Sequence, residues 1–429
     1  MEFTKQFFPD VGETLYSGVS KKGLPVFVFP KKGHAETYAV FATHFGSVNR
    51  QMTFLGDTEE TVLPDGIAHF LEHKMFEEPD GTDAFERFSK TGANANAYTN
   101  FDMTAYLFSC TSGFEENLRS LLDFVQTPHY TEKNVAKEQG IIGQEIRMYD
   151  DDPEWVCYFN CLQGLYHNHP VRIDIAGTVE SIAEITPELL YRCHESFYHP
   201  ANMVLVVAGD VDPEQVGNIV DEMLRTEGRD PIPETFPDEP EAVRDHKVEA
   251  ELAVSMPLFQ LGFKDTPEAD GKELLRRRLI ASLASQLLTG ESSELYQELY
   301  EEGLVNDIID GEIMAQPTYF CNLFTAESEN PEEVCRRLLQ RAQVLPDTPN
   351  FEADFARTKK NAYGSFIKLF NHVDSVASQQ LRFYFEGVSL ADYLPILQSV
   401  TAEDVACYLK ENLTADRAVL SVVRPKKEA

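Results

Sequence analysis

The chain repeats its own pattern at about half its length, and this repeat limits the folds that it can adopt. Three well-separated segments of the first half align with segments of the second half at a near-constant offset of about 216 residues. The aligned pairs are residues 107–122 with 323–338, 185–188 with 400–403, and 202–205 with 417–420. Because a constant offset over three segments is hard to obtain by accident, we expect two duplicated domains of similar fold.

The segment between the two halves is rich in Pro and Glu, which is typical of a linker that runs over the surface. We therefore predict domains at residues 1–225 and 247–429, joined by a linker at 226–246. Each half alternates short β-branched and aromatic stretches with amphipathic ones, which predicts an α+β fold: a mostly antiparallel sheet with helices packed on one face. Predicted strands include residues 24–29, 38–45, 105–110 and 203–208, and predicted helices include 115–126 and 187–198, the latter capped by Thr186.

One segment carries the spacing H-x-x-E-H at His69, Glu72 and His73. On an α-helix these side chains share one face, so the two imidazoles can hold one Zn²⁺ at about 2.0–2.1 Å each. A neighbouring carboxylate that stays free of the metal can take a proton from a bound water. The alternative is a surface helix that carries these residues by chance. However, apolar neighbours such as Phe70 and Leu71 favour a buried helix whose polar groups need a partner.

A zinc site needs at least one further protein ligand, and a second acidic segment offers it. Residues 134–152 predict a long helix with Glu138 and Glu145 seven residues apart, so both carboxylates lie on nearly the same stripe. Glu145 is the candidate third ligand, and Glu138 is a candidate catalytic carboxylate near the water. From the residues alone, ordinary helix surface stays open as the alternative for either glutamate in a chain this acidic.

Together these motifs resemble the pitrilysin/insulinase family of zinc peptidases, which includes the mitochondrial processing peptidases. The resemblance rests on H-x-x-E-H, on the downstream pair Glu138 and Glu145, and on the stretch GANANAYT at residues 92–99. It covers nearly the whole chain. It implies that residues 1–225 form the catalytic peptidase domain and that residues 247–429 form a homologous domain without metal ligands. It also implies site roles: zinc ligands His69, His73 and Glu145, general base Glu72, and a substrate-pairing sheet edge at Asn96 and Ala97.

The second half has lost the chemistry of the first. At the repeat offset, Ser285, Leu288 and Thr289 stand opposite His69, Glu72 and His73, and an alignment of Gly143 with Gly364 places Phe366 opposite Glu145. The family also often carries an Arg and a Tyr in its second domain, which orient substrate and stabilise an oxyanion; here Tyr300 and Asn306 stand in their places. Either a local residue such as Tyr296, Tyr300 or Tyr319 substitutes for this pair, or a partner subunit supplies it.

Composition limits the partners and the compartment. The formal net charge of -34 argues against nucleic acid, whose phosphates would be repelled. No apolar run is long enough for a membrane span, and no signal peptide is evident at the N-terminus. Seven scattered Cys favour reduced thiols, and we expect a cytoplasmic protein. His167 and His169 are predicted to be exposed in a loop.

These observations lead us to expect a zinc-dependent endopeptidase subunit that cleaves peptides or unfolded polypeptides inside a chamber formed by two subunits. The partner is either a second copy of this chain or a related subunit that supplies the Arg/Tyr function. The alternative is an accessory subunit that binds peptides, is inactive or weakly active, and retains zinc for a structural role. A scaffold without metal would require the H-x-x-E-H match to be accidental.

Overall fold

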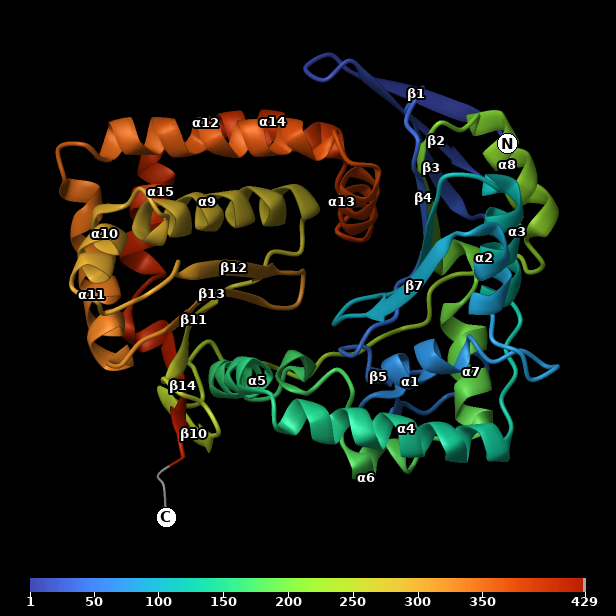
Figure 1. Ribbon diagram of the computed structural model, residues 1–429, viewed down its shortest axis with the longest axis horizontal. Helices are drawn as coiled ribbons and strands as arrows, with labels where there is room; N and C mark the ends of the chain where they lie inside the picture. Colours follow the sequence, from blue (N-terminus) through green and yellow to red (C-terminus); the bar gives the residue numbers. More distant parts are fainter. Residues whose placement is uncertain (427–429) are drawn as a thin grey trace. The chain divides into compact units, whose positions relative to one another are not determined.

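Two separate β-sheets organise the chain, whose computed structural model describes residues 1–426 (Figure 1). Each sheet is the centre of one contact unit. Unit 1 comprises Met1–Ile146, Ile173–Thr235 and Ile367–Phe385, and unit 2 comprises Arg147–Arg172, Phe236–Phe366 and the described residues from 386 to 426. The predicted α+β class, with two sheets that each pack with helices, is confirmed. The predicted linker at 226–246 would divide the chain into two continuous domains. Each unit of the structure is instead built from three separate segments of the sequence.

The sheet of unit 1 has seven strands in the order β1-β2-β3-β9-β4-β8-β7. Their bounds are β1 Phe3–Phe8, β2 Glu13–Val19, β3 Pro25–Pro30, β4 Thr37–Thr43, β7 Asn94–Thr99, β8 Thr104–Cys110 and β9 Met203–Gly209. Only β3 and β9 pair in parallel. A separate small pair joins β5 (Gln51–Met52) to β6 (Thr61–Val62). Every residue of β4 and β9 is buried, so these central strands are covered on both faces.

The sheet of unit 2 has the order β10-β14-β11-β13-β12, with one parallel pair, β10 and β14. The bounds are β10 Lys247–Leu252, β11 Leu258–Asp265, β12 Asp310–Ala315, β13 Phe320–Glu327 and β14 Ala418–Pro425. This order reproduces β3-β9-β4-β8-β7 of unit 1 strand for strand, with the parallel pair in the same place. The duplication inferred from the repeat therefore extends to sheet topology.

Fifteen α-helices accompany the sheets within residues 1–426. The helices wholly or mainly in unit 1 are α1 Ile67–Lys74, α2 Phe85–Thr91, α3 Phe114–Val125, α4 Glu132–Asp150, α6 Val179–Ile182, α7 Pro187–Phe197, α8 Pro213–Met223 and α13 Val373–Phe385. Those of unit 2 are α5 Pro153–Leu165, α9 Gly271–Thr289, α10 Glu294–Glu301, α11 Pro331–Val344, α12 Phe351–Leu369, α14 Leu390–Ser399 and α15 Ala402–Glu411. In the described chain, no helix is both long and apolar enough to cross a bilayer.

Each half of the sequence contributes one helix to the other half's sheet. Helix α13, from the second half, packs on β4 and β9 of unit 1, and its Tyr384 contacts Phe27 of the neighbouring β3 with ring centroids 5.6 Å apart. Helix α5, from the first half, packs on β10, β11 and β14 of unit 2. A glycine is needed at that contact, because a Cβ on Gly262 would lie 2.6 Å from Sγ of Cys161. Each unit is thus completed by a helix from the other half of the sequence.

Candidate metal centre

Helix α1 carries the H-x-x-E-H residues and is fixed in place at its start. Gly66 precedes it with φ of 88°, in the left-handed region that favours glycine. A side chain there would also collide with the backbone, because its Cβ would lie 2.3 Å from the carbonyl oxygen of Ala176. Phe70 and Leu71 are fully buried in the core of unit 1, and this burial sets the rotation of the helix.

Two imidazoles of α1 and one carboxylate of α4 converge, as the sequence predicted. Nε2 of His69 lies 3.7 Å from Oε1 of Glu145, and Nε2 of His73 lies 3.7 Å from Oε2 of the same carboxylate. Ligand atoms around a tetrahedral zinc ion lie about 3.3–3.5 Å apart, so small movements would complete such a site. Among residues 1–426, this is the one group of three or more His, Cys, Asp or Glu residues placed to hold a metal ion.

The environment of His69 suits a metal ligand. Burial, together with the neighbouring His73, lowers the pKa of His69 to about 3. The imidazole is therefore neutral at physiological pH, which is the form that binds a metal. Its Nδ1 is buried without a hydrogen-bond partner. A buried imidazole pair that faces a carboxylate is satisfied jointly when a cation lies between them.

His73 is held from its other side by Glu138. Nδ1 of His73 lies 3.2 Å from Oε1 of Glu138, whose Oε2 lies 3.5 Å from Nζ of Lys74. A proton on Nδ1 that is donated to this carboxylate leaves Nε2 free for a metal. Burial alone would lower the pKa of His73, but the hydrogen bond to Glu138 and the nearby carboxylates outweigh it and raise the pKa. The catalytic role predicted for Glu138 stays a prediction; its contacts here are with two residues of α1.

Glu72 lies on the same helix but has a different partner. Oγ1 of Thr99, at the end of β7, donates a hydrogen bond of 2.7 Å to Oε2 of Glu72. The same hydroxyl lies 3.1 Å from Oγ1 of Thr104, which donates to the carbonyl of Phe45 at 2.8 Å. Burial raises the pKa of Glu72, although the bond from Thr99 and the nearby His73 partly offset this effect. A buried carboxylate with a raised pKa has the electrostatic character of a general base.

The strand β7 brings Asn96 and Ala97 to the rim of this centre. β7 is the last strand of its sheet, and its residues alternate between exposed and half-buried. A cavity of about 400 Å³ is lined by both residues together with Glu72, His73 and Glu138. Since an edge strand presents unpaired backbone groups, a peptide can add to it beside the candidate metal ligands.

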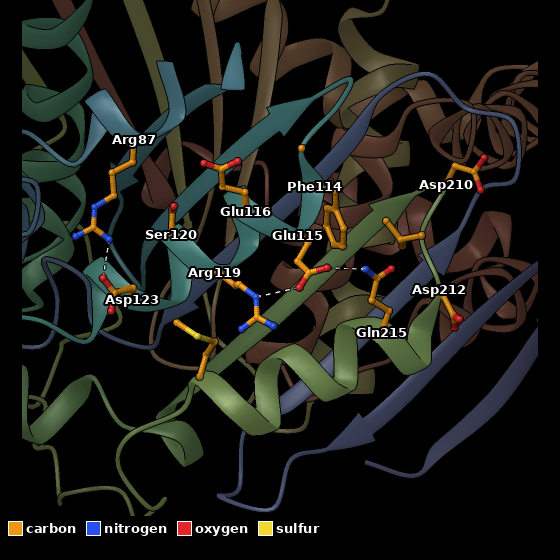
Figure 2. A pocket seen from close by; sticks show the side chains of 13 residues that line it. Arg87, Phe114, Glu115, Glu116, Arg119, Ser120, Asp123, Asp210, Asp212 and Gln215 are labelled. Carbon is orange, nitrogen blue, oxygen red and sulfur yellow. Dashed lines mark hydrogen bonds and ion pairs between the residues drawn. The ribbon is translucent and has the colours of Figure 1, made fainter. Parts of the chain in front are cut away.

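A larger cavity of unit 1, about 880 Å³, lies between α3 and the α8 region and includes none of these residues (Figure 2). Several of its charged side chains are paired within the protein. Figure 2 shows Glu115 between Arg119, at 3.1 Å, and Gln215, at 3.2 Å. Arg87 binds Asp123 at 2.6 Å. The size of a cavity therefore does not locate the chemistry in this unit.

The equivalent places in unit 2 are closed. On α9, Leu288 is fully buried, and Oγ of Ser285 accepts a hydrogen bond of 2.8 Å from Nδ2 of Asn322. On α12, Phe366 stacks on Tyr393 with ring centroids 4.2 Å apart. No metal-ligating group was predicted here. Of the residues considered as substitutes for Arg and Tyr, Tyr300 is exposed on α10, Tyr296 lies beside it on the same helix, and Tyr319 is buried.

The sequence did not point to two residues that contact the candidate site, and it misplaced the side chains of one loop in unit 2. Thr99 and Lys74 were not assigned roles, although the position of Thr99 at the end of the GANANAYT stretch was a usable signal. The prediction that His167 and His169 are exposed was wrong: His167 is half-buried, and His169 is buried and stacks on Phe236, with centroids 5.5 Å apart and planes 3° apart. A polar loop sequence gave no sign of this aromatic partner, which is distant in the chain.

Comparison with known proteins gives consistent matches along the chain. The family model described as "Insulinase (Peptidase family M16)" matches residues 55–179, and that of the "Peptidase M16 inactive domain" matches residues 184–362. YmfH of Bacillus subtilis, named an uncharacterized zinc protease, is 43% identical over 98% of each chain. An M16-like peptidase structure from Alicyclobacillus acidocaldarius is 34% identical, with a TM-score of 0.91 over 99% of each chain. The structure of pitrilysin shares the fold, with a TM-score of 0.76 at 14% identity over 99% of this chain and 47% of its own.

Proposed function

Because the chain belongs to the insulinase (peptidase M16) family of zinc proteases, we propose that it hydrolyses peptides or unfolded polypeptides with a zinc ion held by His69, His73 and Glu145. The observation that carries this proposal is the convergence of the two Nε2 atoms on one carboxylate, 3.7 Å from each. Neutral imidazole and carboxylate are ligands that zinc prefers, and three of them leave a fourth position for water.

Each neighbouring residue then has a defined task. Zinc, when bound, supplies a Lewis acid that lowers the pKa of a coordinated water to about 7. Glu72 takes a proton from the attacking water as its oxygen adds to the scissile carbonyl carbon, and gives that proton to the leaving nitrogen as the C–N bond breaks. The hydroxyl of Thr99 holds one carboxylate oxygen of Glu72 during this exchange. Glu138 orients His73, and this is the role that we propose for it.

The substrate backbone is proposed to bind as an added strand along β7. Asn96 and Ala97 lie on this edge strand and line the cavity that contains Glu72 and His73. Pairing through main-chain groups requires an extended segment, so unstructured peptides are better substrates than folded proteins. Because this pairing uses main-chain groups, we expect the conformation of the peptide to select substrates more strongly than its side chains do.

Metal removal and replacement test the proposed function. We expect the purified protein to contain one zinc per chain and to cleave an unstructured peptide. A chelator should abolish the cleavage, and added zinc should restore it. A protein that retains no zinc, or one that cleaves equally well after the metal is removed, would contradict the proposal. Digestion of the same peptide sequence inside a folded domain serves as the control for substrate conformation.

We further propose that full activity needs a second subunit, with the peptide enclosed between the two. The support is the pair Tyr300 and Asn306, which stand where the family's Arg and Tyr are expected. A related subunit that keeps the Arg/Tyr pair should raise the turnover of this chain by about 10²–10³, the usual contribution of one oxyanion donor. Robust hydrolysis by the homogeneous chain, abolished in Glu72→Gln, would show instead that no such subunit is needed.

The alternative function is an accessory peptide-binding subunit in which zinc is structural. The same Tyr300 and Asn306 favour it, since a site without oxyanion donors retains binding while turnover is slow. Peptide binding with stoichiometric zinc, but without hydrolysis at any subunit composition, would support this alternative. A cytoplasmic location is also part of the proposal, and it is supported by seven free cysteines, of which six are buried.

A further inference from the structure

Lys74, the residue after His73, is the most deeply buried charged side chain at this centre. It is 0% exposed and lies in the last turn of α1. Its Nζ lies 2.6 Å from Oε2 of Glu77 and 3.5 Å from Oε2 of Glu138. Burial of a lysine ammonium is costly unless it is paired, so the ion pairs with both carboxylates stabilise its buried position.

The carboxylate of Glu138 is shared between a metal ligand and this lysine. Its Oε1 faces Nδ1 of His73 at 3.2 Å, and its Oε2 faces Nζ of Lys74 at 3.5 Å. With one oxygen held on each side, the plane of the carboxylate has a fixed orientation. Without Lys74, Oε2 loses its cation and Glu138 remains among like charges, including Glu72 and Glu145, which lie near the same imidazole.

We propose that Lys74 is a positioning residue for the metal centre, acting on His73 through Glu138. The inference rests on the proposed function in that it requires a bound zinc ion, but it concerns a residue that the H-x-x-E-H pattern does not include. Partners that orient a metal-ligating histidine are worth about 10–100-fold in metal affinity. Lys74→Met should therefore weaken zinc binding by about this factor, since methionine fills the same space without a charge.

Unit 1 offers a matched control for the loss of a buried lysine. Lys31 is 4% exposed, and its Nζ lies 2.6 Å from Oε1 of Glu13, without contact to the metal centre. Lys31→Met should lower stability yet leave zinc affinity within about threefold of the parent protein. Zinc affinity is measured by competition with a chromogenic chelator, and the folding of each metal-free variant is checked by its thermal unfolding.

A double-mutant cycle shows whether Lys74 acts through Glu138. We expect Lys74→Met and Glu138→Gln each to weaken zinc binding, and the double variant to be no weaker than Glu138→Gln alone. Unchanged affinity in Lys74→Met, or effects that simply add, would overturn the proposal. If Lys74→Met does not fold, Lys74→Gln takes its place in the same cycle with the same criteria. A parent protein that binds no zinc contradicts the proposed function itself, which is a different outcome from failure of this inference.

Discussion

In unit 1, helix α1 presents His69 and His73 to a carboxylate of α4, whereas in unit 2 helix α9 presents Ser285 to Asn322 of its own sheet. Both helices accompany sheets that share the order of five strands, with the parallel pair in the same place. The difference is that the Ser285 hydroxyl of unit 2 is hydrogen-bonded to Asn322, while in unit 1 two imidazoles face one carboxylate at 3.7 Å, a donor set that suits a metal ion. The two copies of one frame therefore differ in the side chains that they bring together, a hydroxyl and an amide in unit 2 and the candidate metal ligands in unit 1.

The contrast between the two units predicts that the largest loss of activity follows substitution of Glu72. Its counterpart in unit 2, Leu288, cannot take a proton. Glu72→Gln should lower peptide hydrolysis by about 10²–10⁴-fold or more, the usual contribution of a general base. Zinc content should stay at one per chain, since the carboxylate is not needed as a ligand. Both quantities are measured on the same purified sample. If the variant loses its zinc, Glu72 is itself a ligand and the roles must be reassigned.

The next largest effect is expected on zinc affinity, and it can be tested by comparing two glutamates of helix α4. Glu145→Gln should lower zinc affinity by more than the 10–100-fold typical of a residue that only orients a ligand, because a neutral amide binds zinc poorly. Glu132 begins the same helix and is exposed, so Glu132→Gln is the matched control and should retain its zinc. Dialysis against a mild chelator followed by metal analysis distinguishes them. Stoichiometric zinc in Glu145→Gln would exclude the assignment.

A smaller effect is expected at Thr99, which joins β7 to Glu72. Thr99→Val keeps the shape but removes the hydroxyl that donates at 2.7 Å, and should lower kcat roughly tenfold with little change in KM. Thr99→Ser retains the hydroxyl and should restore most of the rate. Steady-state kinetics on one peptide give both constants. A rise in KM with unchanged kcat would indicate that Thr99 serves the substrate strand instead.

The smallest effect concerns a buried histidine of unit 2 that serves no metal. Burial lowers the pKa of His169 to about 4 from its ordinary value of 6.5. Between these values the unfolded chain binds more protons, so stability that is present above pH 6.5 is lost as the pH falls towards 4. His169→Gln should reduce the stability difference between pH 7 and pH 5 by about 1–2 kcal/mol.

The single tryptophan makes this measurement specific. Trp155 lies in α5, which belongs to unit 2, so its fluorescence follows the unfolding of that unit in urea. Metal-free protein is used so that zinc at unit 1 does not contribute. An equal loss of stability with acid in the parent and in His169→Gln would show that another group is responsible.

Local pattern was enough to place most elements and to single out the two candidate metal-binding imidazoles. The strand predicted at 203–208 is β9, Met203–Gly209, and the helix predicted at 187–198 is α7, Pro187–Phe197, capped by Thr186. Spacing along a helix fixes which side chains share a face, so His69 and His73 could be chosen in advance, whereas the choice of Glu145 needed the family resemblance as well. Their neighbours could not: the contact of Lys74 with Glu138 and that of His169 with Phe236 join segments that only tertiary packing brings together.

The exchange of helices was also beyond local pattern, and it governs the order in which the chain can fold. During synthesis, about 370 residues emerge before Val373–Phe385 is available, so the β4 and β9 surface that α13 covers stays open until then. Conversely, α5 is made early but must wait for β10, β11 and β14. Long-range pairing of this kind slows folding and exposes apolar surface to aggregation on the ribosome. Each half of the gene thus depends on the other to mature, although one half alone carries the candidate zinc ligands.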